Sequence, residues 1–146
     1  MKRFSVVLLV DPHGRVLLQE RDEHAPIAPD QWGMVGGHVE DGEEFEPAAY
    51  RELEEETGVR LEPGELRLWR DEEFGYVGAA APNRYTVWVA PTTLTDADIV
   101  VGEGRQIVFV EPEALPDLEL SESSAHFVRA FLDSPEYAGL AGEAAR

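Results

Sequence analysis

The stretch GHVEDGEEFEPAAYRELEEETGV, residues 37–59, decides the fold of the central part of this chain. From Glu44 to Thr57 most residues are good helix formers, and Pro47 lies near the first turn, where proline is tolerated. Gly58 follows at the position where helices commonly end in a left-handed residue. The stretch therefore predicts a loop and then a helix over residues 44–57.

The predicted helix carries a cluster of carboxylates on one side. A helix advances about 100° per residue, so Glu52, Glu55 and Glu56 fall within an arc of about 100°, whereas Glu54 points to nearly the opposite side. Glu52 and Glu56 repel each other, and all three lie near the negative end of the helix dipole. A bound Mg²⁺ or Mn²⁺ with substrate phosphates would offset this repulsion. Solvated acidic helices are also common, so the three glutamates alone fit either interpretation.

The neighbours of the three glutamates favour a site. The small side chains at 48–49 leave room for a substrate on the same side of the helix. Arg51 lies one turn before Glu55 and can reach back toward Glu43, so we expect it to hold the carboxylates in place without taking part in catalysis. The glycine pair that ends in Gly37 lets the backbone approach a ligand closely, and the carbonyl of Gly37 is a further candidate metal ligand.

Residues 37–59 resemble the Nudix box of the Nudix hydrolases, because they match Gly-x5-Glu-x7-Arg-Glu-Leu-x-Glu-Glu-x-Gly-Val at every specified position. The resemblance implies an α/β fold, namely a Nudix-like α/β/α sandwich around a mixed β-sheet. It also implies hydrolysis of a pyrophosphate bond in a nucleoside diphosphate derivative. Val35 stands where many members have a proline, a departure that removes no ligand.

The implied reaction is attack of water on phosphorus, assisted by Mg²⁺ or Mn²⁺ and by a carboxylate that takes the proton. The metal ligands would be Gly37, Glu52, Glu55 and Glu56, and the catalytic candidates are Glu52, Glu55 and Glu103. Glu103 lies between two glycines, so we expect a mobile acidic loop there. A solvated turn glutamate with no role explains Glu103 equally well.

Four further residues are substrate-binding candidates. Arg21 follows the second predicted strand and Arg84 begins a later one, and each could contact a phosphate or a base. Trp32 could stack on a nucleobase, and Phe74 could line the base or sugar pocket. An exposed arginine or a core aromatic ring is the ordinary alternative in each case.

Composition is consistent with a small-molecule enzyme. The 146 residues predict one domain, and 43% of them are hydrophobic, enough for a core. A net charge of −18 argues against binding nucleic acid through its phosphates, although metal ions can reverse the potential within an acidic cleft. No apolar stretch is long enough for a membrane span, the N-terminus does not read as a signal peptide, and cysteine is absent. We expect a cytoplasmic monomer or homodimer that binds a small nucleotide.

The rest of the chain predicts further strands and a terminal helix. We expect strands at 4–10, 16–19, 32–35, 66–73, 85–90 and 106–110, the first two joined in a hairpin-like turn. A helical turn at 111–115 and a helix at 122–132, capped by Ser121, should follow. Residues 136–146 are small and polar, so we expect them to fray.

Several functions compete at this point. A (modified) nucleoside triphosphate or a nucleotide sugar is the favoured substrate, because the chain is short; ADP-ribose and dinucleoside polyphosphates are alternatives. A nucleotide-sensing regulator on the same fold would bind without turnover, but it should have an eroded box, and this box is intact. An isoprenoid diphosphate isomerase of related fold would need a catalytic cysteine, which is absent.

Overall fold

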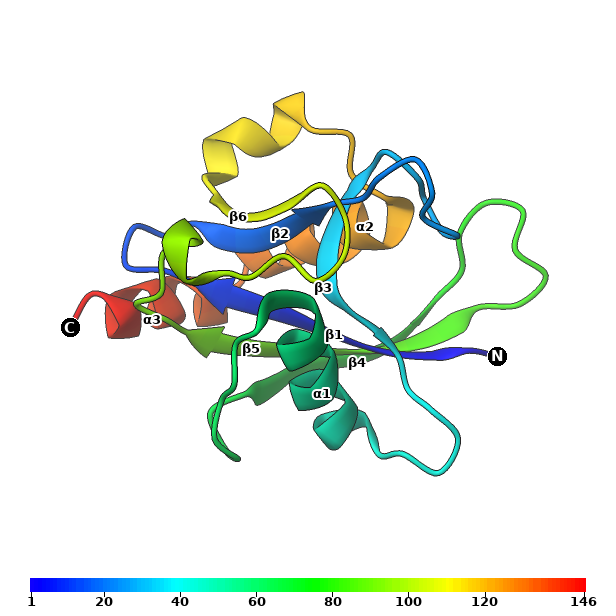
Figure 1. Ribbon diagram of the computed structural model, residues 1–146, viewed down its shortest axis with the longest axis horizontal. Helices are drawn as coiled ribbons and strands as arrows, with labels where there is room; N and C mark the ends of the chain where they lie inside the picture. The colour runs from blue at the N-terminus through cyan, green and yellow to red at the C-terminus, as the bar shows by residue number, and fades with distance from the viewer.

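The computed structural model describes all 146 residues, which fold around one mixed six-stranded sheet (Figure 1). The strand order is β4-β5-β1-β3-β2-β6. β1 and β5 are parallel, and all other neighbours are antiparallel. The strands are β1 (Arg3–Val10), β2 (Val16–Glu20), β3 (Trp32–His38), β4 (Arg67–Phe74), β5 (Asn83–Pro91) and β6 (Gln106–Val110). The expected mixed α/β architecture is confirmed.

Helices cover both faces of the sheet. On β1, Val7 and Leu9 pack in the hydrophobic cluster that contains Leu53 of α1 (Phe45–Thr57). Val6 and Leu8 point to the opposite face, into a second cluster with side chains of α2 (Glu122–Leu132) and α3 (Pro135–Ala144). The two-residue period of the strand therefore sorts its side chains between two cores. In Figure 1, α1 lies on the near face of the sheet and α2 and α3 lie behind it.

Helix α1 begins and ends close to the predicted bounds. Gly58 is left-handed, with φ 73°, and its N–H donates to the Glu54 carbonyl, as the sequence predicts. The expectation that the small residues at 48–49 leave room for a substrate is wrong. Ala48 and Ala49 are fully buried, and their small side chains allow the helix to pack closely on the sheet.

The C-terminal residues correct the expectation of a frayed tail. Residues 135–144 form α3, and Ser134 caps its start, because the Ser134 hydroxyl accepts the N–H of Tyr137 at 3.3 Å. Leu140 is 3% exposed in the core, and Arg67 of β4 makes a bidentate ion pair with Glu143, both distances being 2.8 Å. The small residues that indicated fraying are therefore those of a helix with one buried face.

Other departures from the predicted elements are small. β1 and β2 pair only at Val10 and Val16, because β3 and β5 occupy the edges of β1. Ser121 precedes α2, but its hydroxyl donates to Ser124 Oγ and does not cap the helix backbone. Two 3-10 helices occur, at Asp96–Asp98 and at Pro112–Asp117. No helix is long and apolar enough to cross a membrane.

Candidate functional site

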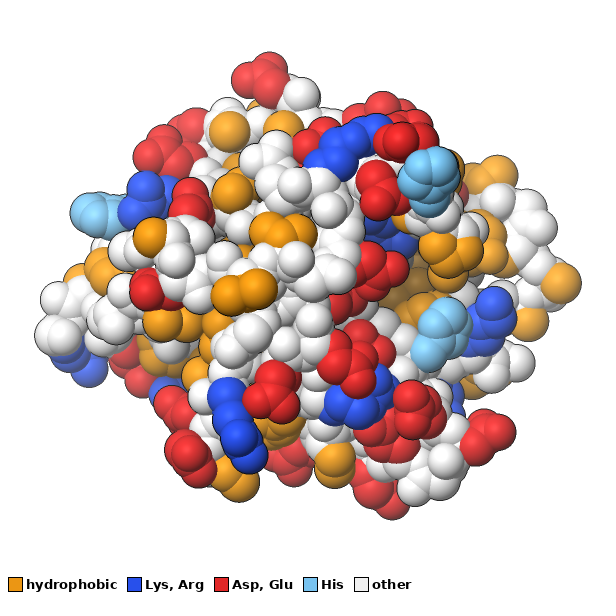
Figure 2. Space-filling view, in the orientation of Figure 1, with side chains coloured by type: hydrophobic (Ala, Val, Ile, Leu, Met, Phe, Trp, Pro, Cys, Tyr) orange, Lys and Arg blue, Asp and Glu red, His pale blue; other side chains and the backbone are white.

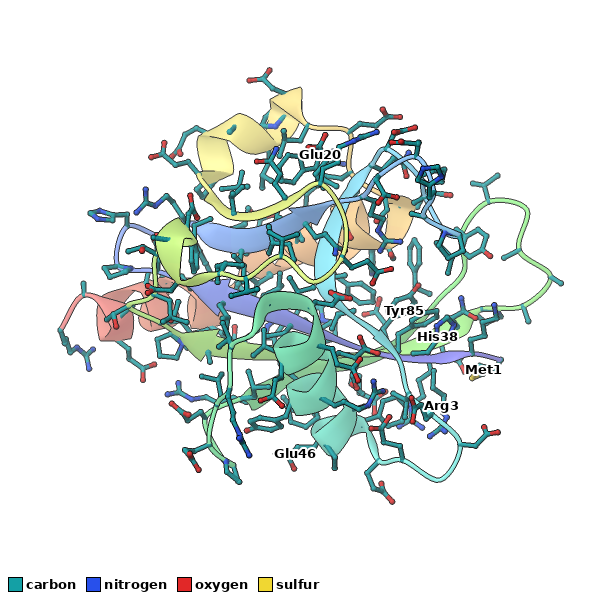
Figure 3. The ribbon with its side chains drawn as sticks, viewed as in Figure 1. Met1, Arg3, Glu20, His38, Glu46 and Tyr85 are labelled. Carbon is teal, nitrogen blue, oxygen red and sulfur yellow. The ribbon has the colours of Figure 1, made fainter.

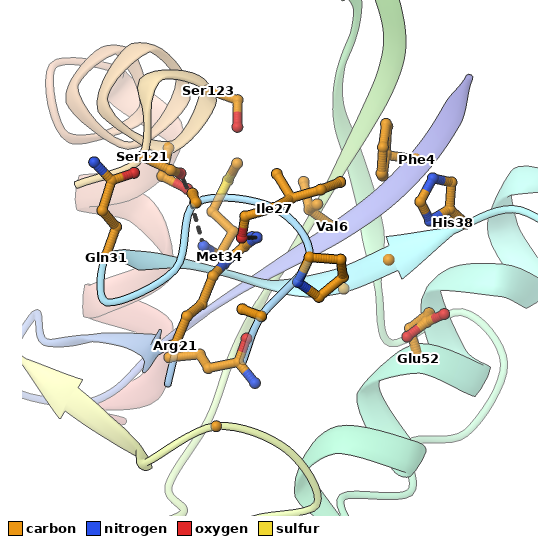
Figure 4. A pocket seen from close by; sticks show the side chains of 18 of the residues that line it. Phe4, Val6, Arg21, Ile27, Gln31, Met34, His38, Glu52, Ser121 and Ser123 are labelled. Carbon is orange, nitrogen blue, oxygen red and sulfur yellow. Dashed lines mark hydrogen bonds between the residues drawn. The ribbon is translucent and has the colours of Figure 1, made fainter. Parts of the chain in front are cut away.

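A cleft of about 590 Å³ opens between α1, the N-terminal end of α2 and the loop that connects β2 to β3. Its apolar floor comes from the sheet, with Phe4, Val6 and Met34. Figure 4 shows Glu52 at one end of this cleft and Ser121 and Ser123 at the other, with Arg21 and Ile27 between them. The cleft is therefore elongated, with Glu52 at the α1 end and serine side chains beside Glu122 at the α2 end.

The cleft is strongly negative. Its lining includes six carboxylate side chains and one arginine, and Figure 2 shows acidic side chains around this hollow. The six are Asp22, Glu40, Glu52, Glu56, Glu103 and Glu122, and the arginine is Arg21. An anionic substrate could not enter such a cleft unless cations accompanied it.

Two glutamates of α1 point into the cleft and are partly or wholly removed from water. Glu56 is 6% exposed, and burial, with the nearby Glu52 and Glu103 carboxylates, raises its pKa to about 8. The Gly36 N–H donates to Glu56 Oε2 at 3.2 Å and partly offsets this effect. Burial also raises the pKa of Glu52, against the lowering effect of Arg51. Two carboxylates that face one cleft and whose pKa values are both raised are candidates for binding a cation.

Arg51 connects the helix to the loop before it. Its Nε and Nη2 donate to the two carboxylate oxygens of Glu43, at 2.7 and 2.8 Å, and Nη2 also donates to the His38 carbonyl at 3.0 Å. Its Nη1 donates to Glu52 and to Glu55, each at 3.1 Å. These bonds lower the pKa of Glu43 to about 2 and raise the pKa of Arg51. The contact between Arg51 and Glu43 that the sequence predicts is present.

The backbone of β3 comes very close to this carboxylate cluster. A Cβ atom on Gly37 would lie 2.7 Å from Glu52 Oε1, so a side chain there would displace the carboxylate. Gly36, at φ 141°, would place a Cβ 2.3 Å from the Ser5 carbonyl oxygen. Gly37 therefore lets β3 pass beside Glu52, and Gly36 lets β3 pair closely with β1.

The side chains fit a divalent cation in part. The available donors are carboxylate oxygens, the hard ligands that Mg²⁺ and Mn²⁺ prefer, and Glu52 and Glu56 both face the cleft. No three acidic or histidine side chains lie close enough to form a complete ligand set. The side chain of Glu55 is 59% exposed, does not line the cleft and is bound to Arg51. To act as a ligand, Glu55 would have to turn from Arg51 toward the ion.

The loop that carries Glu103 lines the cleft and is hydrogen-bonded to the elements on either side of it. The N–H groups of Val100 and Gly102 donate to the carbonyls of Thr57 and Glu56, at 2.9 and 2.8 Å, and so satisfy the C-terminal end of α1. Gln19 Nε2 donates to the Glu103 carbonyl at 2.8 Å. Glu103 is thus placed opposite Glu52 and Glu56 by contacts with both α1 and β2.

Of the four substrate-binding candidates, only Arg21 lines the cleft. Its Nη1 donates to the Ile27 carbonyl at 2.8 Å, its Nε is buried without a hydrogen-bond partner, and burial lowers its pKa. Trp32 packs against the core beside α2. Phe74 stacks on His126, with ring centroids 4.9 Å apart. Arg84 pairs with Asp71 at 2.6 Å and lies over the Phe45 ring.

The rest of the cleft, away from Glu52 and Glu56, consists mainly of residues that the sequence does not indicate. Ile27 and Gln31 come from the β2–β3 loop, and Ser123 and Ser124 come from α2. Tyr85 of β5 lies toward His38 (Figure 3), because both rings pack on Phe4. These residues belong to no sequence motif. Residues of the β2–β3 loop and of α2 are far apart in the sequence, and only the order of the strands makes them neighbours.

A mixed sheet between helices, with Glu56 buried and Glu52 partly buried on the helix after a glycine-rich strand end, suits a hydrolase that acts on phosphoric anhydrides with a metal ion. A family model described as NUDIX domain matches residues 1–131. The chain belongs to the Nudix family, and its activity is hydrolysis of pyrophosphate bonds in nucleotide derivatives. Nudix hydrolases generally use divalent metal ions.

Individual relatives support this assignment. A nucleoside triphosphatase from Enterobacter is 30% identical over 129 residues, covering 84% of this chain and 92% of the relative. An RNA pyrophosphohydrolase from Novosphingobium aromaticivorans is 49% identical, over 77% of this chain and 78% of the relative. The solved structure of the E. coli dihydroneopterin triphosphate pyrophosphohydrolase superposes with a TM-score of 0.70 and 25% identity, covering 88% of this chain and 93% of that one.

Proposed function

We propose that this enzyme hydrolyses a (modified) nucleoside triphosphate or a nucleotide sugar with Mg²⁺ or Mn²⁺. The observation that carries the proposal is the elongated cleft. Its acidic end holds Glu52 and Glu56, and its other end combines an apolar floor with the polar side chains of Gln31 and Ser123. Such a cleft suits a molecule with a phosphate chain at one end and a ring with hydrogen-bonding groups at the other.

The residues of the acidic end have divided roles. Glu52 and Glu56 would hold the cation, with Glu55 joining after it leaves Arg51 and the Gly37 carbonyl as a further ligand. A bound divalent ion supplies charge neutralisation for the phosphates and lowers the pKa of a water molecule. Glu103 or Glu52 takes the proton of the attacking water. Arg51, paired with Glu43, holds the end of β3 against the helix. Arg21, the one arginine of the cleft, would lie beside the phosphates.

The relatives differ in what their names say they act on. One is a nucleoside triphosphatase, one acts on RNA and one on dihydroneopterin triphosphate. The net charge of −18 disfavours a long RNA, because each phosphate outside the cleft would meet an acidic surface. A free nucleotide therefore suits this chain better. We place the enzyme in the cytoplasm, where nucleotides and Mg²⁺ are available, as a monomer or homodimer.

A substrate screen tests the proposal. The arms are the common and oxidised nucleoside triphosphates, nucleotide sugars, ADP-ribose, a dinucleoside polyphosphate and a short 5′-triphosphate RNA, each with Mg²⁺ and with Mn²⁺. The products are identified by which phosphates are released. We expect the highest kcat/KM for a triphosphate or a nucleotide sugar, with a value lower by about 100-fold or more in a Glu56→Gln control. Preference for the RNA, ADP-ribose or the dinucleotide would replace the proposed substrate, and binding of nucleotide without turnover would indicate a sensor.

A further inference from the structure

The loop between β2 and β3, residues 21–31, forms one rim of the cleft. It contributes the residues Arg21, Asp22, Ala25, Pro26, Ile27, Ala28 and Gln31 to the lining. In Figure 4, Ile27 lies between the Glu52 end and the Ser123 end of the cleft. This rim loop therefore faces the part of a substrate that joins its phosphates to its ring.

The rim loop holds an unfavourable backbone conformation. Ala28 and Asp30 both have positive φ angles, 48° and 65°, although neither is glycine. Side chains make this conformation costly, and it persists only where other contacts enforce it. Its backbone hydrogen bonds include Arg21 N–H to the Gln31 carbonyl at 2.9 Å, Asp30 N–H to the Asp22 carbonyl at 3.1 Å and Gln31 N–H to the Ala28 carbonyl at 3.3 Å.

The side chain of Arg105, which lies outside the rim loop, binds residues near both ends of the loop. Arg105 Nη2 lies 2.8 Å from a carboxylate oxygen of Glu23 and 2.5 Å from one of Asp30. Its Nη1 donates to the Arg21 carbonyl at 3.3 Å and lies 3.7 Å from a Glu20 carboxylate oxygen. The backbone of Arg105 is held just before β6, because its N–H donates to the Glu20 carbonyl at 2.9 Å.

Without Arg105, the carboxylates that it binds would repel one another. Glu20, Glu23 and Asp30 converge on this single guanidinium, so its removal leaves three carboxylates facing one another. An isolated exposed ion pair contributes little to stability. Three carboxylates that share one guanidinium form a network, and removing the guanidinium replaces attraction by repulsion between the carboxylates. The bonds within the loop, such as Arg21 Nη1 to the Ile27 carbonyl, would remain, and outside it Gln31 Nε2 would still donate to Glu119 at 3.3 Å.

We propose that Arg105 is a positioning residue that clamps the rim loop in its substrate-binding conformation. This inference rests on the proposed function, since it assigns the loop to substrate binding in the same cleft. Arg105 does not line the cleft and acts only through Glu23, Asp30 and the loop backbone. Its loss should weaken substrate binding and leave the chemical step, at Glu52 and Glu56, unchanged.

The test compares the wild-type enzyme with Arg105→Gln, Arg105→Lys and the double variant Glu23→Gln/Asp30→Asn. Asparagine tolerates positive φ, so the double variant removes the ion pairs without adding strain. Arg67→Gln is the matched control, because it breaks a bidentate surface ion pair with Glu143 outside the cleft. Each variant is measured for kcat and KM on the best substrate of the screen, and for amide hydrogen exchange of residues 21–31 in free enzyme.

For Arg105→Gln we expect faster exchange at Asp30 and a KM raised about five-fold, with kcat within about two-fold of wild type. The double variant should show the same pattern, and Arg105→Lys should restore part of the loss. Unchanged exchange in the rim loop would overturn the proposal, as would a fall in kcat at constant KM or the same effects in Arg67→Gln. If no nucleotide is turned over, the proposed function fails, and the exchange measurement still decides whether Arg105 clamps the loop.

Discussion

Arg51 binds Glu43 through two parallel hydrogen bonds, Nε to Oε2 at 2.7 Å and Nη2 to Oε1 at 2.8 Å. Planar guanidinium and carboxylate groups make their strongest pair in this geometry. The pair joins the loop before α1 to the middle of the helix, and the same guanidinium reaches Glu52 and Glu55. It therefore links the fold of the segment to the placement of its carboxylates.

We predict that Arg51→Ala reduces stability and activity together. The substitution removes five hydrogen bonds, including one to the His38 carbonyl, and leaves Glu43, Glu52 and Glu55 without their shared cation. The expected loss in the free energy of unfolding is about 1–3 kcal/mol, measured by urea denaturation. Arg60→Ala serves as the control, because Arg60 is exposed and makes a single, long ion pair of 3.7 Å with Glu54. An Arg51→Ala variant with wild-type stability and full turnover would show that the bracing role is mistaken.

Glu56→Gln should abolish most activity and leave the fold intact. The amide keeps the size of the side chain but is a poor ligand for a hard cation, so we expect kcat to fall about 100-fold or more. Added Mg²⁺ or Mn²⁺ should raise the melting temperature of the wild type and have little effect on this variant. Glu54→Gln is the matched control on the same helix, because Glu54 is exposed and pairs only with Arg60. Near-normal turnover in Glu56→Gln would refute the assignment of the metal site.

The raised pKa of Glu56 predicts how stability depends on pH in metal-free enzyme. Its pKa is about 8 in the folded protein, against 4.5 for an ordinary glutamate, so the folded state binds this proton more tightly than the unfolded state. The contribution is fully present below pH 4.5 and is lost as pH rises through 8. Chemical denaturation at several pH values, in chelator, should show wild type losing stability relative to Glu56→Gln across this range. Parallel curves for the two proteins would contradict it.

A contact can be predicted from the sequence when the two residues that make it lie close together along the chain. Helix α1, its Gly58 terminus and the pairing of Arg51 with Glu43 all lie within 23 residues, where helix geometry determines which side chains meet. The strand at 106–110 was predicted with its observed bounds, because its apolar run is short and clearly delimited.

The parts that the sequence could not predict involve distant residues. Arg105 meets Glu23 and Asp30 only because β6 lies beside β2, and no local pattern indicates that pairing. Glu55 and Glu56 are adjacent in the sequence, and helix geometry predicts both on one face of α1. Yet Glu56 is buried and Glu55 is largely exposed. The difference arises from β3 and the Glu103 loop, which cover only one side of that face.

Helix α3 offers a final test, because small residues gave no indication that it would be ordered. Leu140 is 3% exposed and belongs to the core cluster that contains Phe131 and Val128. We expect Leu140→Ala to lower the free energy of unfolding by about 2–5 kcal/mol, since the substitution leaves a cavity between α3 and the sheet. Leu68→Ala is the matched control, because Leu68 is 51% exposed on β4. Urea denaturation measures both, and equal small losses would mean that α3 contributes no more to stability than an exposed strand residue. Because Leu140 does not line the cleft, kcat and KM of the folded Leu140→Ala enzyme should stay at wild-type values, separating the stabilising role of α3 from catalysis.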